Sequence, residues 1–168
     1  MSLLHAARQC LSNVAAHKSF NAFISVKSEE AILDAVKNAT TQESTHNASR
    51  QLAGRLIAIK DNICTSDLPT TSASGILRNF TSPYDATVVR QLQDAGAVVV
   101  GKTNLDEFGM GSHSKHSYFG AVRQEWGKDQ AAVSAGGSSG GSAVAVATGQ
   151  CWAYVHFGIA RLRHTHRT

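Results

Sequence analysis

The order of apolar and polar residues along the chain predicts an α/β fold. Residues 56–59 and 97–101 are short, almost uninterrupted apolar runs of the kind that form buried strands. Between them, residues 85–96 have the apolar spacing of a helix, with Asp85 as an acidic cap and Gly96 as a stop. A strand, a helix and a strand at this spacing predict a parallel strand pair within an α/β sheet.

Three further helices are predicted from the same kind of periodicity. One covers residues 28–38 behind a capping Ser28, one begins at Thr103, and one covers residues 142–148 and ends at Gly149. Polar stretches without periodicity separate these elements, and we expect a linker over 39–51, a long loop over 61–84 and irregular structure over 111–137.

The first 20 residues leave two interpretations open. Their apolar residues recur at helical spacing, and no acidic residue occurs before Glu29. This composition is typical of a mitochondrial presequence, and also of an amphipathic N-terminal helix that belongs to the mature fold. We therefore divide the chain into residues 1–20, a main domain over 21–153 and a basic tail over 154–168.

Composition narrows the class of protein without identifying its chemistry. A chain of 168 residues with 42% hydrophobic residues has material for one modest domain, and it contains no run of 18 apolar residues that would span a membrane. The three cysteines are widely spaced and form no CxxC pair. We therefore expect neither a disulfide framework nor a zinc site, and favour a reducing compartment.

Positive charge is concentrated at the two ends of the chain. The formal net charge is +4, but residues 29–153 contain ten basic and twelve acidic residues, which gives that region a net charge of −2. Residues 1–28 and 154–168 each carry three basic residues and no acid. A nucleic-acid-binding protein would need a basic cluster inside its folded part, so this class is not favoured.

The glycine–serine loop from Gly136 to Ser142 is the first candidate for chemistry. It precedes a helical Ala/Val segment, so its backbone N–H groups could bind an anion or an oxyanion at the start of the helix. A nucleotide-binding P-loop would require a lysine between the last glycine and the hydroxyl residue, where this chain has Gly141-Ser142.

Lys60 is the second candidate, because a lysine and a serine can form a proton relay to a nucleophile. It follows four apolar residues at the end of the first predicted strand. There it is either a solvated edge residue or a partly buried amine. Burial would lower its pKa and let the amine act as a base.

His113 and His116 lack a third ligand cluster, and we expect them, like His164 and His166 of the tail, to bind no metal.

Four segments of the chain, in this order, resemble the amidase signature family: residues 54–64, 70–75, 101–112 and 134–142. The resemblance covers about residues 20–153. It implies the N-terminal part of that family's α/β/α fold with a mixed central sheet, incomplete in this chain.

The resemblance also implies roles for individual residues. In the family, the lysine of the Ile-Lys-Asp-Asn segment is the base of a Ser–cis-Ser–Lys triad, and it corresponds to Lys60. The bridging serine, which follows a cis peptide bond, corresponds to Ser138. Gly111 and Ser112 stand in a segment similar to the family's acyl-pocket lining, and are the expected substrate-binding residues.

The chain departs from the family where the nucleophile is expected. The family's nucleophilic serine lies in an Asp-Thr-Gly-Gly-Ser segment that would fall near Leu162, yet no serine follows Ser142. The resemblance stops near Ala153, and the His- and Arg-rich tail resembles sequence from a shifted reading frame or a retained intron. We therefore expect the chain as given to be catalytically inactive.

The resemblance finally implies a reaction and its partners. It favours a glutaminase that supplies ammonia to a tRNA-dependent amidotransferase complex of the mitochondrial matrix, which converts Glu-tRNA(Gln) to Gln-tRNA(Gln). The expected partners are the other subunits of that complex, one of which uses ATP; no cofactor, metal or membrane is expected on this chain. Two alternatives stay open: a free-standing amidase of the same family, and a non-catalytic fragment that only binds partner subunits.

Overall fold

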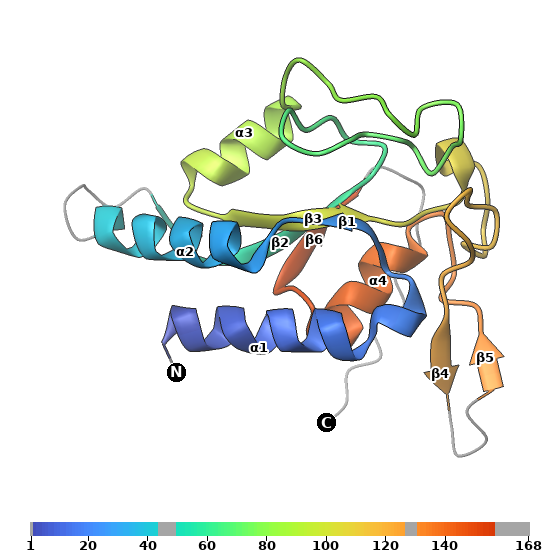
Figure 1. Ribbon diagram of the computed structural model, residues 1–168, viewed down its shortest axis with the longest axis horizontal. Coiled ribbons are helices and arrows are strands. Elements are labelled where there is room, and N and C mark those ends of the chain that lie inside the picture. The colour runs from blue at the N-terminus through green and yellow to red at the C-terminus, as the bar shows by residue number, and fades with distance from the viewer. Residues whose placement is uncertain (1, 44–49, 127–130, 157–168) are drawn as a thin grey trace.

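A four-stranded mixed sheet with helices on both faces forms the centre of the molecule (Figure 1). The computed structural model describes residues 2–43, 50–126 and 131–156. The strand order is β1-β3-β2-β6, where β1 is Phe23–Val26, β2 is Leu56–Lys60, β3 is Val98–Thr103 and β6 is Ala153–Val155. β2 pairs in parallel with β3 and β6, and β1 runs antiparallel to β3. The predicted parallel pair and the α/β class are confirmed.

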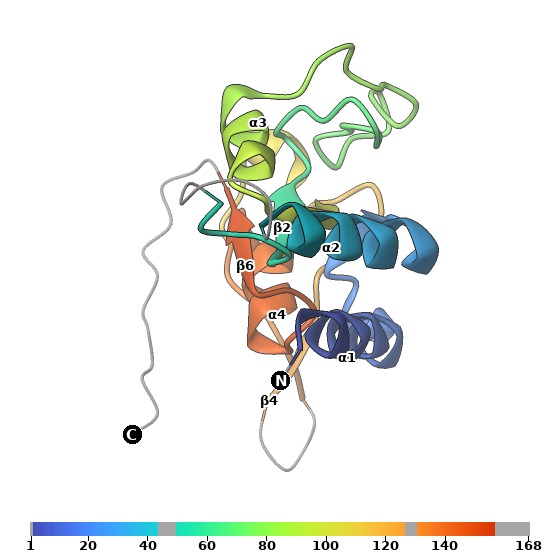
Figure 2. The same cartoon turned by 90° about the vertical axis from the view of Figure 1, so that its left-hand side faces the viewer.

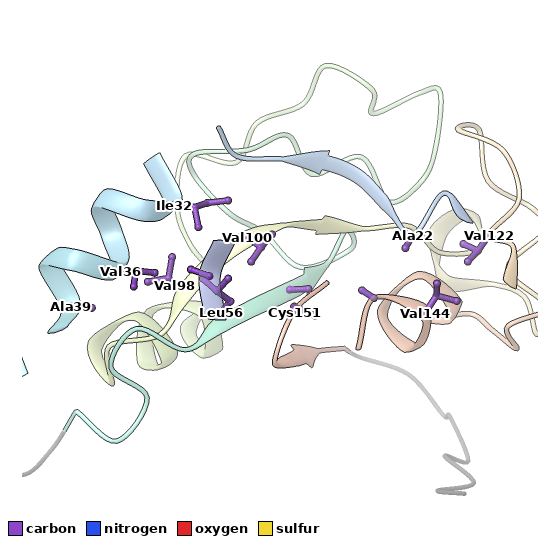
Figure 3. Close-up of a cluster of buried hydrophobic side chains, with 13 residues drawn as sticks. Ala22, Ile32, Val36, Ala39, Leu56, Val98, Val100, Val122, Val144 and Cys151 are labelled. Carbon is purple, nitrogen blue, oxygen red and sulfur yellow. The ribbon is translucent and has the colours of Figure 1, made fainter. Parts of the chain in front are cut away.

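Apolar side chains cover both faces of this sheet. On one face, Leu56, Val98 and Val100 pack with buried residues of α1 (Leu3–Ala16), α2 (Glu29–Glu43) and α4 (Gly140–Ala147) (Figure 3). On the opposite face, Ile57 and Ile59 pack against α3 (Thr87–Asp94), which lies on the other side of the sheet from α1 and α4 (Figures 1 and 2). Strands buried on both faces have no polar alternation, which explains the uninterrupted apolar runs in the sequence.

The N-terminal helix α1 is packed into the domain. Ala7 is buried in the same apolar cluster, with the partly buried Leu3 and Leu11 against it. The Nδ2 atom of Asn13 donates a hydrogen bond to the carbonyl of Gly149 at 3.0 Å, which links this helix to the end of α4. No helix among the described residues combines the length and the apolar character needed to cross a lipid bilayer.

Helix α2 begins where the sequence predicts and ends later. The N–H of Ala31 donates to the Oγ atom of Ser28 at 3.3 Å, which confirms the cap. The helix continues to Glu43, so the expected linker is wrong for residues 39–43, because Ala39 packs into the apolar cluster and keeps this turn on the sheet. The rest of that linker, over 44–49, lies outside the described residues.

Helix α3 shows the expected apolar face and glycine stop, but a different start. Gly96 has a φ of +92°, a conformation that favours glycine. The N-cap residue is Ala86, and the expected cap by Asp85 is wrong. The carboxylate of Asp85 instead accepts hydrogen bonds from the N–H and Oγ of Ser66, at 2.6 and 3.0 Å. This acid therefore fastens the long loop over 61–84, which contains neither helix nor strand.

Two other predictions are wrong in the second half of the chain. Residues 103–108 do not begin a helix: Thr103 ends β3, and only the short 3₁₀ turn η2 (Glu107–Gly109) follows. Pairing with β1 on one side and β2 on the other keeps this segment extended. The expected irregular region contains a small antiparallel sheet of β4 (Gln124–Trp126) and β5 (Ala131–Val133), which projects from one end of the molecule (Figure 1). A 3₁₀ turn, η1 (Lys18–Phe20), precedes β1.

Candidate active site

Lys60 is the last residue of β2, and its side chain is fully buried. The strands β3 and β6 flank β2 on its two sides, so the end of this strand lies inside the fold. Burial lowers the pKa of Lys60 from its ordinary value, and the negative charge of Asp106 opposes part of that shift. The structure thus decides between the two interpretations of Lys60 in favour of the buried amine.

Ser138 reaches Lys60 from the loop that precedes α4. The Nζ atom of Lys60 donates a hydrogen bond to the Oγ atom of Ser138 at 2.7 Å. The peptide bond between Gly137 and Ser138 is cis, as the family resemblance implied. The pair lies at the carboxyl end of the parallel strand β2, the end of the sheet at which α/β folds bind their ligands.

The other two serines of the glycine–serine loop have different surroundings. The Oγ atom of Ser139 lies 3.4 Å from the Nδ1 atom of His156, which follows β6. Ser142 is fully buried on α4, and its Oγ atom lies 2.6 Å from the Oγ1 atom of Thr103 at the end of β3. Ser142 thus fixes the helix to the sheet, and Ser138 is the loop serine that bonds Lys60.

The first backbone N–H groups of α4 form hydrogen bonds with other residues of the chain. The N–H of Gly140 donates to the Oγ of Ser114 at 2.9 Å, and the N–H of Gly141 donates to the carbonyl of Asn104 at 3.2 Å. A Cβ atom at Gly141 would lie closer than 3.0 Å to the backbone of Asn104, so this close approach requires glycine. The expectation that the loop offers its N–H groups to an anion is therefore wrong for these two residues.

Gly111 and Ser112 are exposed, and Ser112 lies against Gly137, the residue before Ser138. A Cβ atom at Gly137 would lie 2.5 Å from the backbone nitrogen of His113 and 2.7 Å from the carbonyl carbon of Ser112. The Oγ atom of Ser112 lies 2.9 Å from the Nδ1 atom of His113. The structure thus brings the expected substrate-binding residues next to the Lys60–Ser138 pair, and their binding role stays a prediction.

Asp106, which the sequence did not single out, is fully buried beside this pair. Its carboxylate accepts hydrogen bonds from the N–H groups of Ser114 at 2.8 Å and His116 at 3.0 Å. Its own N–H donates to the carbonyl of Ser138 at 3.2 Å. The sequence signal was weak, because an acid two residues after Asn104 looks like the first turn of a helix, where acids are common.

Lys102, on the neighbouring strand β3, is also fully buried but supports the site from the other face of the sheet. It pairs in register with Ile59, so its side chain points away from the face on which Lys60 lies. Its Nζ atom lies 3.1 Å from Oδ1 of Asp61 and donates to Oγ1 of Thr70 at 2.8 Å. Because Asp61 also accepts a hydrogen bond from the N–H of Thr71, this cluster anchors the long loop that follows Lys60.

His113 and His116 are both exposed. Within residues 2–43, 50–126 and 131–156, no three His, Cys, Asp or Glu side chains are placed to hold a metal ion together. His164, His166 and the position near Leu162 at which the nucleophile was expected lie outside the described residues.

The Ser–Lys pair, the cis peptide bond and the mixed sheet are those of an amidase-signature enzyme. The sequence profile of the Amidase family matches residues 6–154, and the chain belongs to this family. It is 55% identical over 154 residues to a mitochondrial glutamyl-tRNA(Gln) amidotransferase subunit of Coccidioides posadasii, an alignment that covers 91% of this chain and 31% of that protein.

Two solved structures superpose on most of this chain. The corresponding glutamyl-tRNA(Gln) amidotransferase subunit of Thermotoga maritima superposes with a TM-score of 0.69 at 37% identity, over 90% of this chain and 30% of that one. The peptide amidase of Stenotrophomonas maltophilia superposes with a TM-score of 0.75 at 31% identity, over 90% of this chain and 32% of that one. The chain therefore spans about a third of the length of these proteins.

Proposed function

We propose that this chain is the N-terminal part of the glutamine-hydrolysing subunit of a Glu-tRNA(Gln) amidotransferase. The observation that carries the proposal is the hydrogen bond between the buried Lys60 and the partly buried Ser138, in a chain 55% identical to such a subunit over 154 residues. Burial lowers the pKa of Lys60, so its ammonium loses a proton more readily than that of an ordinary lysine, and the amine can then accept one from the relay. Gly111 and Ser112, beside Ser138, line the pocket for the acyl part of glutamine in this proposal.

The reaction proceeds through two proton transfers along the pair. A nucleophilic serine attacks the carboxamide carbon of glutamine, its proton passes to Oγ of Ser138, and the proton of Ser138 passes to Nζ of Lys60. The tetrahedral intermediate then collapses, the C–N bond breaks, and the leaving nitrogen takes a proton back through Ser138 and departs as ammonia. Water hydrolyses the resulting ester to glutamate by the same relay.

The proposed partners follow from the relative's name and not from contacts of this chain. The ammonia passes to other subunits of the complex, where ATP is used to convert Glu-tRNA(Gln) to Gln-tRNA(Gln) in the mitochondrial matrix. The packing of α1 against the domain supports the interpretation of this segment as a helix of the folded domain, since Ala7 is buried in the apolar cluster.

We further infer that the chain as given does not hydrolyse glutamine by itself. The family's nucleophile would fall near Leu162, and no serine follows Ser142. Ammonia release by the purified chain, measured with a coupled glutamate dehydrogenase assay, is expected to equal the buffer blank. Glutamine hydrolysis that disappears in a Ser138→Ala variant would overturn this inference.

A chimera tests the main proposal independently of the missing nucleophile. Residues 6–154 of this chain would replace the matching segment of the Coccidioides posadasii protein, which supplies the rest of the enzyme. The chimera is expected to hydrolyse glutamine, and Lys60→Met and Ser138→Ala are each expected to lower kcat by at least about 100-fold. Lys37→Met and Ser12→Ala, at exposed helix positions, are the matched controls. Full activity in the Lys60→Met chimera would refute the proposed base.

A free-standing amidase is the second candidate, supported by the superposition on the peptide amidase with a TM-score of 0.75. The higher identity to the amidotransferase protein, 55% against 31%, favours the first candidate. The same chimera distinguishes the two candidate functions. When it is expressed with the other subunits of the complex, the first candidate predicts that it forms Gln-tRNA(Gln) from Glu-tRNA(Gln). Hydrolysis of peptide amides in preference to glutamine would favour the free-standing amidase.

A further inference from the structure

We propose that Asp106 is a positioning residue of the Lys60–Ser138 pair: it holds the backbone around Ser138 and places a negative charge opposite the Lys60 ammonium. The inference rests on the proposed function, in which Lys60 is the base. It assigns a role to a fully buried acid that the relay does not itself use; Asp61, the other fully buried acid among the residues that the structure describes, pairs with Lys102.

Asp106 is attached to Ser138 on one side and to the start of α4 on the other. Its N–H donates to the carbonyl of Ser138 at 3.2 Å. Its Oδ2 atom accepts a hydrogen bond from the N–H of Ser114 at 2.8 Å, and the Oγ of Ser114 in turn accepts one from the N–H of Gly140 at 2.9 Å. The backbone positions on both sides of Ser139 are thus tied, directly or through Ser114, to a single aspartate.

Two glycines make room for the Asp106 side chain. A Cβ atom at Gly137 would lie 2.5 Å from Oδ2 of Asp106, and a Cβ atom at Gly111 would lie closer than 3.0 Å to the same carboxyl group. Gly137 forms the cis peptide bond to Ser138, and Gly111 belongs to the expected substrate-binding segment. The carboxylate therefore lies between the relay loop and the pocket segment, where it fixes their relative position.

The charge of Asp106 acts on Lys60 between two side chains that are both removed from solvent. Both side chains are fully buried, and attraction between opposite charges is stronger in such an environment than in water. Asp106 raises the pKa of Lys60 against the larger opposite effect of burial. It therefore stabilises the ammonium that forms each time Lys60 accepts a proton from the relay.

Two other titratable groups near Lys60, His156 and Asp61, do not supply the negative charge that Asp106 supplies. His156 faces Lys60 from the end of β6, but a histidine offers no negative charge, and the positive charge of Lys60 helps to lower the pKa of His156. Asp61 follows Lys60 in the chain, but its carboxylate forms an ion pair with Lys102, which lies on the opposite face of the sheet. Asp106 is thus, among the described residues, an acid whose charge acts on Lys60.

The titration of Lys60 tests this role directly. In the purified chain with ¹³C-labelled lysine, the Cε resonance of Lys60 gives its midpoint, and a Lys60→Met spectrum provides the assignment. Asp106→Asn is expected to lower the midpoint by about one pH unit or more, since it removes the charge and keeps the size of the side chain. Asp34→Asn, at an exposed position on α2, is the matched control and is expected to leave the midpoint unchanged. An unchanged midpoint in a folded Asp106→Asn variant would overturn the proposal.

A second measurement covers the case in which Asp106→Asn does not fold. In the wild-type chain, the ¹³Cγ resonance of Asp106 is expected to move at the pH at which Lys60 loses its proton, because the carboxyl carbon senses the loss of the neighbouring positive charge. A resonance that stays constant through that pH would overturn the role of Asp106. If Lys60 of the wild-type chain instead titrates with the ordinary midpoint of a lysine, at a pH of about 10.4, this refutes the proposed base and with it the proposed function.

Discussion

The Nζ atom of Lys60 lies 2.7 Å from the Oγ atom of Ser138, although 78 positions separate the two residues in the chain. Lys60 ends a central strand, and Ser138 precedes the helix α4. The hydrogen bond between the hydroxyls of Ser142 and Thr103, at 2.6 Å, fixes that helix to the end of the neighbouring strand. The contact between Lys60 and Ser138 therefore depends on the packing of α4 against the sheet.

Loss of Lys102 is expected to destabilise the fold strongly. Its Nζ atom lies 3.1 Å from the Asp61 carboxylate, and both side chains are fully buried. Lys102→Met would leave a buried carboxylate without its cation, which costs about 3–5 kcal/mol in the free energy of unfolding. Urea denaturation monitored by circular dichroism measures this loss.

An exposed ion pair of the same type provides the control for Lys102. Lys37 lies 2.9 Å from Asp34 on α2, and both side chains are more than half exposed. Lys37→Met is expected to change the free energy of unfolding by less than about 1 kcal/mol. The account of the buried pair would be wrong if the two variants lost the same stability.

The stability of the protein is expected to fall as the pH is lowered through the ordinary titration range of histidine. Burial, and to a smaller extent the charge of Lys60, lowers the pKa of His156. The unfolded chain therefore binds a proton at His156 at a higher pH than the folded chain does, and acid favours unfolding. His156→Gln removes this contribution, so its unfolding free energy should decrease less than that of the wild type between pH 7.5 and pH 5.

Urea midpoints at these two pH values measure the contribution of His156. His5→Gln is the matched control, because His5 is exposed on α1. If His156→Gln and the wild type lose the same stability between the two pH values, the lowered pKa of His156 is incorrect.

Cys151 is expected to resist alkylation in the folded protein. It is buried, and burial raises the pKa of its thiol to about 12, so the reactive thiolate is scarce at neutral pH. Cys64 is half-buried in the long loop and serves as the internal reference. Mass spectrometry after a short exposure to iodoacetamide at pH 7.5 should show label on Cys64 well before Cys151, and equal labelling only in urea. Equal rates in the native protein would contradict the buried position of Cys151.

Sequence periodicity predicted the elements whose own residues carry a strong apolar pattern. The helices expected over 85–96 and 142–148 both form, as α3 and α4, and the apolar runs over 56–59 and 97–101 form the parallel pair of β2 and β3. The strands β1 and β6 were not predicted, because each is short and owes its extended form to a neighbour distant in the sequence. The same cause explains the false helix at Thr103, where pairing on both sides outweighs a sequence that looks like a helix start.

The sequence also predicted some residues of the candidate site and missed others. Lys60 and Ser138 were expected as partners because the family resemblance joined two motifs, and periodicity alone left Lys60 undecided. Asp106 could not be found from the sequence, because its role depends on Gly111 and Gly137, which surround its carboxyl group only after the chain folds. Asp85 shows the reverse case. The sequence predicts that it caps helix α3, but its carboxylate accepts a hydrogen bond from Ser66, which is distant in the chain.

The pKa of Lys60 in the wild-type chain tests the central claim most directly, because a base in the relay must lose its proton more readily than an ordinary lysine. Its ¹³Cε resonance, followed between pH 6 and pH 11.5, reports the protonation of this amine alone. Burial of Lys60 predicts a midpoint below the ordinary value of about 10.4. A midpoint at or above that value would show a lysine that stays charged, and would contradict its role as the base.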